Sequence, residues 1–196
     1  MQDSRSKIIE AAFRLFAEQG LDGTTTKQIS EEAGVNEVTI FRNFGTKEAL
    51  FRESVVQYLP VGDIRKGVHF DPEGSLDEQM FKNAKTVLRI ISSNRHPLQM
   101  MIGELWRHPD LSEHVLQEAM DPMIDFLAEN FEQFVRRGKM RKVDGKVAAR
   151  SWIGLVQSYF IFNYLLRIDP PTSQQEDQAL KGLVDIFLNG VKGDAR

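Results

Sequence analysis

The side chains from Val38 to Asn43 have the chemistry to read the edges of DNA bases. Arg42 carries a guanidinium group that can donate two parallel hydrogen bonds to O6 and N7 of guanine. Thr39 can contact a thymine methyl group, and Asn43 can reach a phosphate or an adenine. These groups can read DNA only where a rigid element holds them in the major groove, so the prediction depends on whether the surrounding residues form such an element.

The flanking residues predict two short helices that are joined by a tight turn. Gly34 can adopt the left-handed conformation that re-aims the chain, and Asn36 can cap the second helix through its side-chain oxygen. Ile40 and Phe44 lie four residues apart and should face a core, which leaves the base-reading candidates on the outer face. This layout is that of a helix-turn-helix.

Contacts to the DNA backbone should come from other residues. Thr25 or Thr26 stands where the first of the two helices begins, and Lys47 stands where the next helix along the chain begins. A helix N-terminus with a hydroxyl or an ammonium group beside it is a ready site for a phosphate. We therefore expect Thr25, Thr26 and Lys47 to hold the DNA backbone.

The composition indicates a globular protein, but the charge gives no support to nucleic-acid binding. The chain has 196 residues, 41% of them hydrophobic, and a net charge of -3. Residues 1–50 contain six basic and eight acidic side chains, so we expect weak non-specific affinity for DNA with a modest salt dependence. Because the sequence lacks cysteine and begins with no signal-peptide pattern, we expect a cytoplasmic protein without disulfides or thiolate metal sites.

Turn and cap residues divide the chain into about nine helices, with almost no strand pattern. The first helix opens at Ser4 or Ser6 and ends near Gly20, and the fourth begins after Thr46 and ends at Pro60. The predicted fold is all-α. A three-helix head occupies residues 1–46, and a larger ligand-binding and dimerisation body occupies residues 47–196.

After the fourth helix, the body contains one predicted loop and five more helices. The segment from Gly62 to Gly74 is predicted as a loop from its composition. Capping boxes open three helices, at Ser75 with Glu78, Asp110 with Glu113 and Ser173 with Glu176. The other two helices are predicted between Pro97 and Pro109 and from about Asp144 to Arg167.

The head follows a known order of motifs over residues 5–51, RSKIIEAAFRLFAEQGLDGTTTKQISEEAGVNEVTIFRNFGTKEALF. A helix ends in glycine, a threonine-rich cap opens the next, Ala-Gly-Val makes the turn, and Phe-x-x-Lys-Glu-x-Leu leads into the fourth helix. In this order, and in its helical body, the chain resembles the TetR family of bacterial transcriptional regulators. The resemblance implies a repressor that binds operator DNA and responds to a small molecule; activators are less usual in the family.

The resemblance also draws attention to Phe41 and Asn43. Members of the family often place a tyrosine and a histidine at these positions, and both hold phosphates. Phe41 has no hydroxyl to donate, so it either contacts DNA in another way or packs against the first helix. Phe41, Arg42 and Asn43 are where we expect this protein's own operator preference to lie.

The last two helices predict a homodimer. Residues 147–168 are apolar on nearly every face, which requires more cover than one chain readily provides, yet the segment is too short and too polar to span a membrane. A two-fold dimer is the economical solution, as in the resembled family. The expected seam residues are Trp152, Phe160, Leu183 and Phe187. A dimer should read a palindromic operator, with its two recognition helices about 34 to 36 Å apart.

The body also holds aromatic and methionine side chains that suit an adaptable apolar cavity. The expected pocket residues are Met101, Trp106, Met123, Phe126, Gln157, Tyr159 and Phe162, and Met100 belongs to the same set. Each apolar member alone is more typical of the core than of a ligand wall, and Gln157 could bond either a ligand or a helix across the dimer seam. The predicted effector is small and apolar or aromatic. The alternative is a constitutive DNA-binding regulator without an effector.

No set of residues indicates an enzyme, a metal site or a cofactor. The four histidines are scattered and there is no cysteine. Glu104 and His108 lie at i and i+4, a spacing that is more typical of a helix surface pair than of a metal site. We expect a regulator without catalytic residues.

Overall fold

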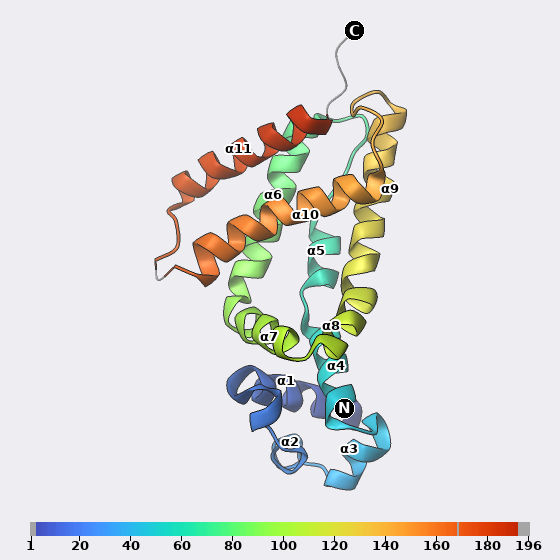
Figure 1. Ribbon diagram of the computed structural model, residues 1–196, viewed down its shortest axis with the longest axis vertical. Coiled ribbons are helices and arrows are strands. Elements are labelled where there is room, and N and C mark those ends of the chain that lie inside the picture. The colour runs from blue at the N-terminus through green and yellow to red at the C-terminus, as the bar shows by residue number, and fades with distance from the viewer. Residues whose placement is uncertain (1–2, 168, 192–196) are drawn as a thin grey trace. The chain divides into compact units, whose positions relative to one another are not determined.

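A computed structural model describes residues 3–167 and 169–191, without the side chains of Met100, Gly190 and Val191 (Figure 1). Throughout this part of the chain the ordered elements are helices, and the predicted all-α class is confirmed. The helices are α1 (Ser4–Gly23), α2 (Thr26–Ala33), α3 (Glu37–Phe44), α4 (Lys47–Tyr58), α5 (Val61–Gly67), α6 (Leu76–Ser93), α7 (Arg95–Arg107), α8 (Pro109–Val115), α9 (Asp121–Arg136), α10 (Gly145–Phe160) and α11 (Ser173–Val191). Two π-helical turns, η1 (Leu116–Met120) and η2 (Ile161–Leu165), follow α8 and α10. Within these residues no helix has the length and apolar character to cross a membrane.

Packing divides the chain into two compact units. The first unit contains residues 1–59 and 96–120, and the second contains residues 60–95 and 121–196. The boundary predicted after residue 46 separates the expected DNA-binding head from the expected ligand-binding and dimerisation body. By packing, α4 and residues 96–120 belong with the first three helices.

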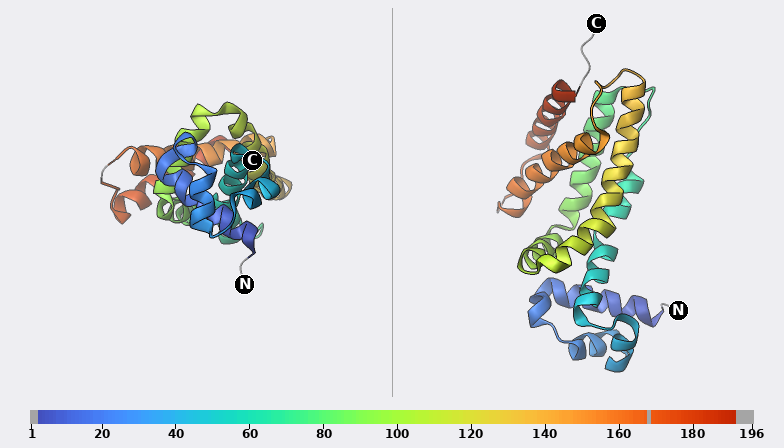
Figure 2. Two further views of the ribbon diagram at one scale, coloured as in Figure 1. Left: turned by 90° about the horizontal axis from the view of Figure 1, so that it is seen from below. Right: turned by 45° about the vertical axis from the view of Figure 1, so that its right-hand side comes forward.

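Local caps shape the first unit as the sequence predicts. Gly20 leaves helical geometry at φ 73°, and the chain then turns into α2. Thr46 caps α4 by accepting the N–H of Ala49, and α4 ends just before Pro60. Within this unit, α2 and α3 lie at one end and α7 and α8 at the other, with α1 between them (Figures 1 and 2).

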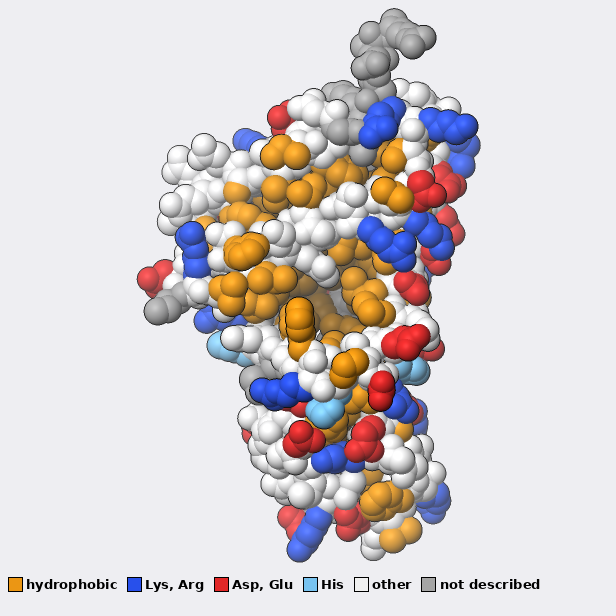
Figure 3. Space-filling view, in the orientation of Figure 1, with side chains coloured by type: hydrophobic (Ala, Val, Ile, Leu, Met, Phe, Trp, Pro, Cys, Tyr) orange, Lys and Arg blue, Asp and Glu red, His pale blue; other side chains and the backbone are white. Residues whose placement is uncertain are grey.

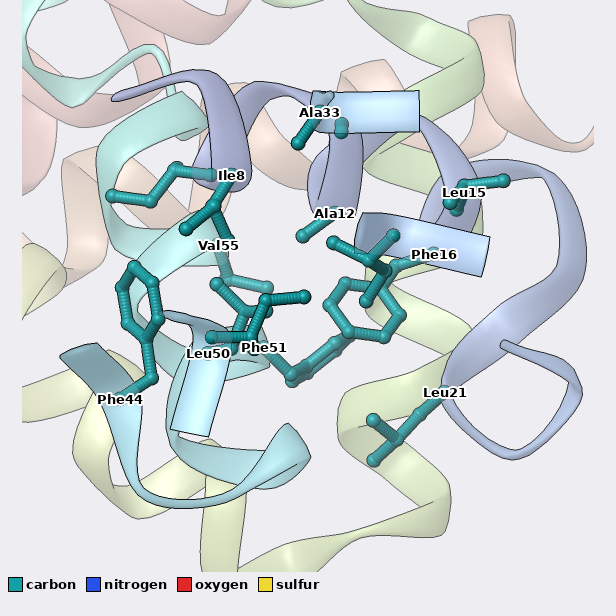
Figure 4. Close-up of a cluster of buried hydrophobic side chains, with 14 of the residues drawn as sticks. Ile8, Ala12, Leu15, Phe16, Leu21, Ala33, Phe44, Leu50, Phe51 and Val55 are labelled. Atoms are coloured by element: carbon teal, nitrogen blue, oxygen red, sulfur yellow. The ribbon is translucent and has the colours of Figure 1, made fainter. Parts of the chain in front are cut away.

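The core of the first unit forms between α1 and α4. Phe16 and Phe51 meet edge to face with their ring centroids 5.2 Å apart, and both are buried. Figure 4 shows Ile8, Ala12, Leu50 and Val55 around this pair. The buried face of α3 joins the same core through Phe44, so the position of α3 depends on α1 and α4.

The second unit has its own aromatic core. Phe131 on α9 lies 5.8 Å from Phe187 on α11, and Trp152 on α10 lies 5.1 Å from the same ring. The ring of Phe70, which precedes α6, contacts Phe131 from another side. Helix α10 packs on α6, α9 and α11, so it is the central element of this unit.

The structure corrects several predicted boundaries. The segment predicted as a loop after Gly62 contains α5, a short helix without a strong apolar pattern. Asp110 does not cap its helix, because α8 already begins at Pro109. The cap of α11 lies one residue earlier than predicted, at Thr172, whose hydroxyl and backbone N–H both bond Gln175. Helix α7 starts at Arg95, ahead of the predicted Pro97.

Candidate nucleic-acid interface

The turn between α2 and α3 is held by backbone hydrogen bonds. Gly34 has left-handed geometry, with φ 66° and ψ 37°, and its N–H faces the carbonyls of Ser30 and Glu31. The N–H of Val35 donates to the carbonyl of Ser30 at 3.0 Å. This closure fixes the angle at which the chain enters α3.

Two side chains secure the start of α3. Asn36 accepts the N–H of Val38 at 2.9 Å, which confirms the predicted cap. Glu37 accepts the hydroxyl of Thr26 at 2.5 Å and so ties the start of α3 to the start of α2. The second bond is not evident from the sequence, because it joins residues eleven positions apart.

The two faces of α3 have opposite environments. Ile40 and Phe44 are 1% and 7% exposed and pack into the core, whereas Val38 on the outer face is 71% exposed. Arg42 and Asn43 are exposed and Thr39 is half-buried. Phe41 is 48% exposed, so about half of its side chain is open to solvent on this face. The outer face of α3 therefore presents both apolar side chains, Val38 and Phe41, and polar ones, Arg42 and Asn43.

The polar groups on this face differ in their readiness to bind bases. Among the residues that the structure describes, the Arg42 guanidinium makes no ion pair, so it is free to approach a base. Asn43 donates its amide N–H to the carbonyl of Thr39 at 2.6 Å. A two-bond contact to adenine needs one N–H and the oxygen of the same amide, and Asn43 still has its second N–H and its oxygen for such a contact.

The start of α2 uses its threonine hydroxyls internally. Thr25 and Gln28 form a reciprocal capping box, in which the Thr25 hydroxyl donates to Gln28 and accepts the Gln28 N–H. The Thr26 hydroxyl donates to Glu37. The first N–H groups of a helix have no partner within it, so a phosphate at this end would meet backbone donors before the threonine hydroxyls.

Lys47 is half-buried, and its ammonium group is engaged within the head. Its Nζ donates to the carbonyl of Leu21 at 2.7 Å and to that of Thr24 at 3.0 Å. An ammonium group has three N–H donors, so one remains for a phosphate. Lys47 thus joins the start of α4 to the last turn of α1 and to Thr24, which follows it, a role that sequence reasoning missed.

Several cations of residues 1–50 are already paired. Arg5 bonds Glu53 and also lies 5.1 Å from the centre of the Phe44 ring. Arg14 on α1 pairs with Glu32 on α2 at 3.0 Å. With these two cations paired inside the unit, fewer remain for DNA phosphates, and the modest salt dependence stays a prediction.

The expected pocket residues are not brought together in one unit. Met101 and Trp106 belong to the first unit, where Met101 is buried and Trp106 is 81% exposed. The remainder lie in the second unit: Met123 is buried, Phe126 and Tyr159 are half-buried, Gln157 is exposed and Phe162 is 62% exposed. The side chain of Met100 lies outside the described part of the chain.

A cleft in the second unit has a volume of about 410 Å³. Its walls come from the start of α6 and the segment before it, with His69, Asp71, Gln79, Lys82 and Asn83 among the lining residues. None of the expected pocket residues lines it. The Asn83 amide is satisfied by the backbone N–H and carbonyl of His69, so it serves to hold this segment.

Two tyrosines near the junction of α10 and η2 have an unusual environment. Burial raises the pKa of Tyr159 above its ordinary value, and Glu176 adds to the effect. Burial also raises the pKa of Tyr164, whose hydroxyl donates to Glu176 at the start of α11. Both tyrosines stay neutral near pH 7, and the hydrogen bond from Tyr164 to Glu176 links η2 to α11.

The expected seam residues need correction. Trp152, Phe160 and Phe187 are each no more than 4% exposed within a single chain, and Trp152 packs against the ring of Phe187. Only Leu183 is half-buried. The exposed apolar side chains on these elements are Val147, Ile161, Phe162, Leu166 and Ile186. Figure 3 shows apolar side chains gathered where α10 continues into η2.

Glu104 and His108, the i and i+4 pair of the sequence, have specific partners. The Glu104 carboxylate accepts the N–H of Leu21 at 2.9 Å and pairs with Arg107. The His108 Nε2 atom lies 3.7 Å from Glu104 and 3.8 Å from Asp22. Within the described residues, no three His, Asp or Glu side chains are grouped so as to hold a metal ion.

Comparisons with known proteins match the whole chain to one kind of regulator. A family profile described as bacterial regulatory proteins, tetR family, matches residues 8–54. A second, described as the C-terminal domain of AefR-like transcriptional repressors, matches residues 78–190. The first match covers α3 and the turn before it, and the second covers most of the second unit.

Similar proteins agree with these matches. The HTH-type transcriptional regulator YvkB of Bacillus subtilis is 25% identical over 194 residues, which is 99% of this chain and 100% of YvkB. IcaR of Staphylococcus epidermidis, a negative transcriptional regulator of a biofilm operon, is 37% identical over 51 residues, or 26% of this chain and 28% of IcaR. Among solved structures, the flavonoid-responsive regulator FrrA superposes with a TM-score of 0.80 at 23% identity, covering 98% of each chain. A TetR-family regulator from Mesorhizobium loti has a TM-score of 0.79 at 20% identity, covering 97% of each.

Proposed function

Because the chain belongs to the TetR family of bacterial regulatory proteins, we propose that it is a dimeric repressor that binds a palindromic operator and is released by a small molecule. Its place in the family makes it a DNA-binding transcriptional regulator. Its fold is that of such regulators and does not suggest an enzyme. The observation that carries the proposal is the outer face of α3, where Arg42 is exposed and without an ion pair in the described chain. Such a regulator acts on DNA in the cytoplasm.

The DNA contacts follow from this geometry. Arg42 reads guanine through a two-bond contact, and Thr39 and Phe41 supply apolar contact to thymine methyl groups. Asn43 contacts a phosphate or an adenine through the amide N–H that it does not donate to Thr39 and, for adenine, through its amide oxygen. The phosphate contacts come from Lys47, through its remaining N–H, and from the start of α2 at Thr25 and Thr26.

The dimer forms through the exposed apolar side chains of α10, η2 and α11. Phe162, Leu166 and Ile186 are each more than 60% exposed in the single chain. Helices α10 and α11 pack against each other, and exposed apolar residues of this size are typical of a contact surface. A second copy of the chain is the proposed occupant, because the family's regulators act as dimers on two-fold symmetric DNA.

Replacing both Phe162 and Ile186 with glutamate should convert the dimer to a monomer. Each substitution introduces a charge into a surface that excludes water, and four such charges would face one another across the two-fold axis. Sedimentation velocity measures the change. Trp106→Glu is the matched control, because Trp106 is 81% exposed but lies in the other unit, and it should leave the dimer intact. If the double variant sediments as the wild type does, the seam lies elsewhere.

The effector is proposed to be a small aromatic molecule. The solved structure of FrrA, which has the same fold, is described as a flavonoid-responsive regulator, and this supports an aromatic ligand for the present chain. A ligand that binds only the folded state stabilises it by RT ln(1 + L/Kd), where L is the free ligand concentration, so the melting temperature rises with the logarithm of that concentration above the dissociation constant. A panel of flavonoids that leaves both the melting temperature and operator binding unchanged would favour the constitutive alternative.

Selection of duplexes from a randomised DNA library by the full chain tests the proposed function. The enriched sequence should be an inverted repeat with half-sites centred about 10 base pairs apart. The chain should bind this duplex on the order of 1,000-fold more tightly than a shuffled duplex of the same composition. Equal binding of the two duplexes would reject the function.

A further inference from the structure

Glu104 is almost completely buried, which is unusual for a carboxylate on a helix. It is 2% exposed on α7, whereas its ion-pair partner Arg107 has a side chain that is 69% exposed. Burying a carboxylate is costly unless hydrogen bonds and charges compensate for the lost water. The partners of Glu104 therefore indicate what the burial achieves.

One of these partners is the backbone at the end of α1. Gly20 has φ 73°, so the helix breaks there and the N–H of Leu21 leaves the helical pattern. Glu104 Oε2 accepts that N–H at 2.9 Å, across 83 residues of sequence. A Cβ atom on residue 20 would lie 2.9 Å from Glu104 Oε1, so glycine allows both the turn and the approach of the carboxylate.

The same backbone segment carries the bonds that orient the candidate DNA contacts. The Leu21 carbonyl accepts a hydrogen bond from Lys47, and so does the Thr24 carbonyl. The Thr24 side chain is fully buried and donates to the carbonyl of Gly20 at 2.8 Å. Thr25, the next residue, caps α2. One short segment thus joins α7 to Lys47 and to the start of α2.

We propose that Glu104 is a positioning residue, through which α7 sets the placement of the phosphate-binding groups at Lys47 and at the start of α2. The inference rests on the proposed DNA-binding function. When the carboxylate holds the Leu21 N–H, residues 20–25 are fixed and these groups meet the DNA backbone together. Without the carboxylate the segment loses its anchor, and operator affinity falls without any change on α3.

The test compares three variants of the full chain by titration with the selected operator duplex. Glu104→Ala should bind the operator about 10-fold more weakly, within the usual range of coupling between sites, and by the same factor for operators with altered bases. Glu104→Gln keeps an acceptor for the Leu21 N–H and should stay within about 3-fold of the wild type. Met80→Ala, which opens the core of the second unit, is the control for a general loss of stability.

All titrations are made well below the lowest melting temperature, so that every variant is folded. Wild-type affinity in Glu104→Ala would overturn the inference. An equal loss in Met80→Ala, or in Glu104→Gln, would also overturn it, because stability or charge would then explain the effect. If the wild type does not distinguish the operator from shuffled DNA, the proposed function fails instead.

Amide hydrogen exchange tests the same link without DNA. In Glu104→Ala the Leu21 amide should exchange faster, together with those of residues 22–26, while the amides of α3 keep their protection. Unchanged exchange at Leu21 would overturn the inference whatever the DNA result. Faster exchange in this segment alone supports it.

Discussion

Replacing Phe51 with alanine should lower the free energy of unfolding by about 3 to 5 kcal/mol. Phe51 is 1% exposed and contacts the ring of Phe16 at the centre of the first unit (Figure 4). The substitution removes an aromatic side chain from between α1 and α4 and leaves a cavity that the surrounding helices cannot fill. Urea denaturation followed by circular dichroism measures the loss.

Phe41→Ala is the matched control for this prediction. The same side chain is removed from the same unit, but Phe41 is 48% exposed on the outer face of α3. Its removal should cost less than about 1 kcal/mol, in the range of surface substitutions. Equal losses in the two variants would mean that the α1–α4 core does not hold the unit together.

Replacing Arg42 with alanine should weaken operator binding by about 1 to 3 kcal/mol, which is roughly 5- to 150-fold. Arg42 lies on the exposed face of α3 and forms no ion pair in the part of the chain that is described, so its loss leaves the fold unchanged. Fluorescence anisotropy with the selected duplex measures the affinity. Arg42→Lys keeps the charge without the two-bond geometry, so it should recover non-specific affinity but not the preference for the operator.

The local signals of the head could be predicted from the sequence because they act over a few residues. Gly34, Asn36 and Thr46 each have the role that their types and positions predict. The outward placement of Arg42 also follows from the spacing of Ile40 and Phe44. These features depend on helix periodicity and capping, which short sequence windows contain.

The contacts between distant segments could not be predicted in this way. The bond between Glu104 and Leu21 and the bonds of Lys47 to two carbonyls depend on how α1, α4 and α7 pack. The sequence identifies Lys47 as a cation at a helix start, but it does not predict the hydrogen bonds of Lys47 inside the head. These bonds make Lys47 a structural residue as well as a proposed phosphate contact.

The seam shows a second limit of sequence reasoning. The apolar character of residues 147–168 indicates a helix with more than one covered face, but it does not say which face the chain itself covers. The structure shows that Trp152 packs against Phe187 of the same chain. The proposed dimer surface therefore moves to the exposed residues Phe162 and Ile186.

The central claim is that α3 reads operator bases through Arg42, and a base-by-base competition titration tests it most directly. Every base pair of the selected operator is changed in turn, and each duplex competes for the wild type and for Arg42→Ala. The wild type should lose affinity at a guanine in each half-site, at positions related by the two-fold axis, and Arg42→Ala should lose discrimination at those positions alone. Identical profiles for the two proteins would contradict the claim.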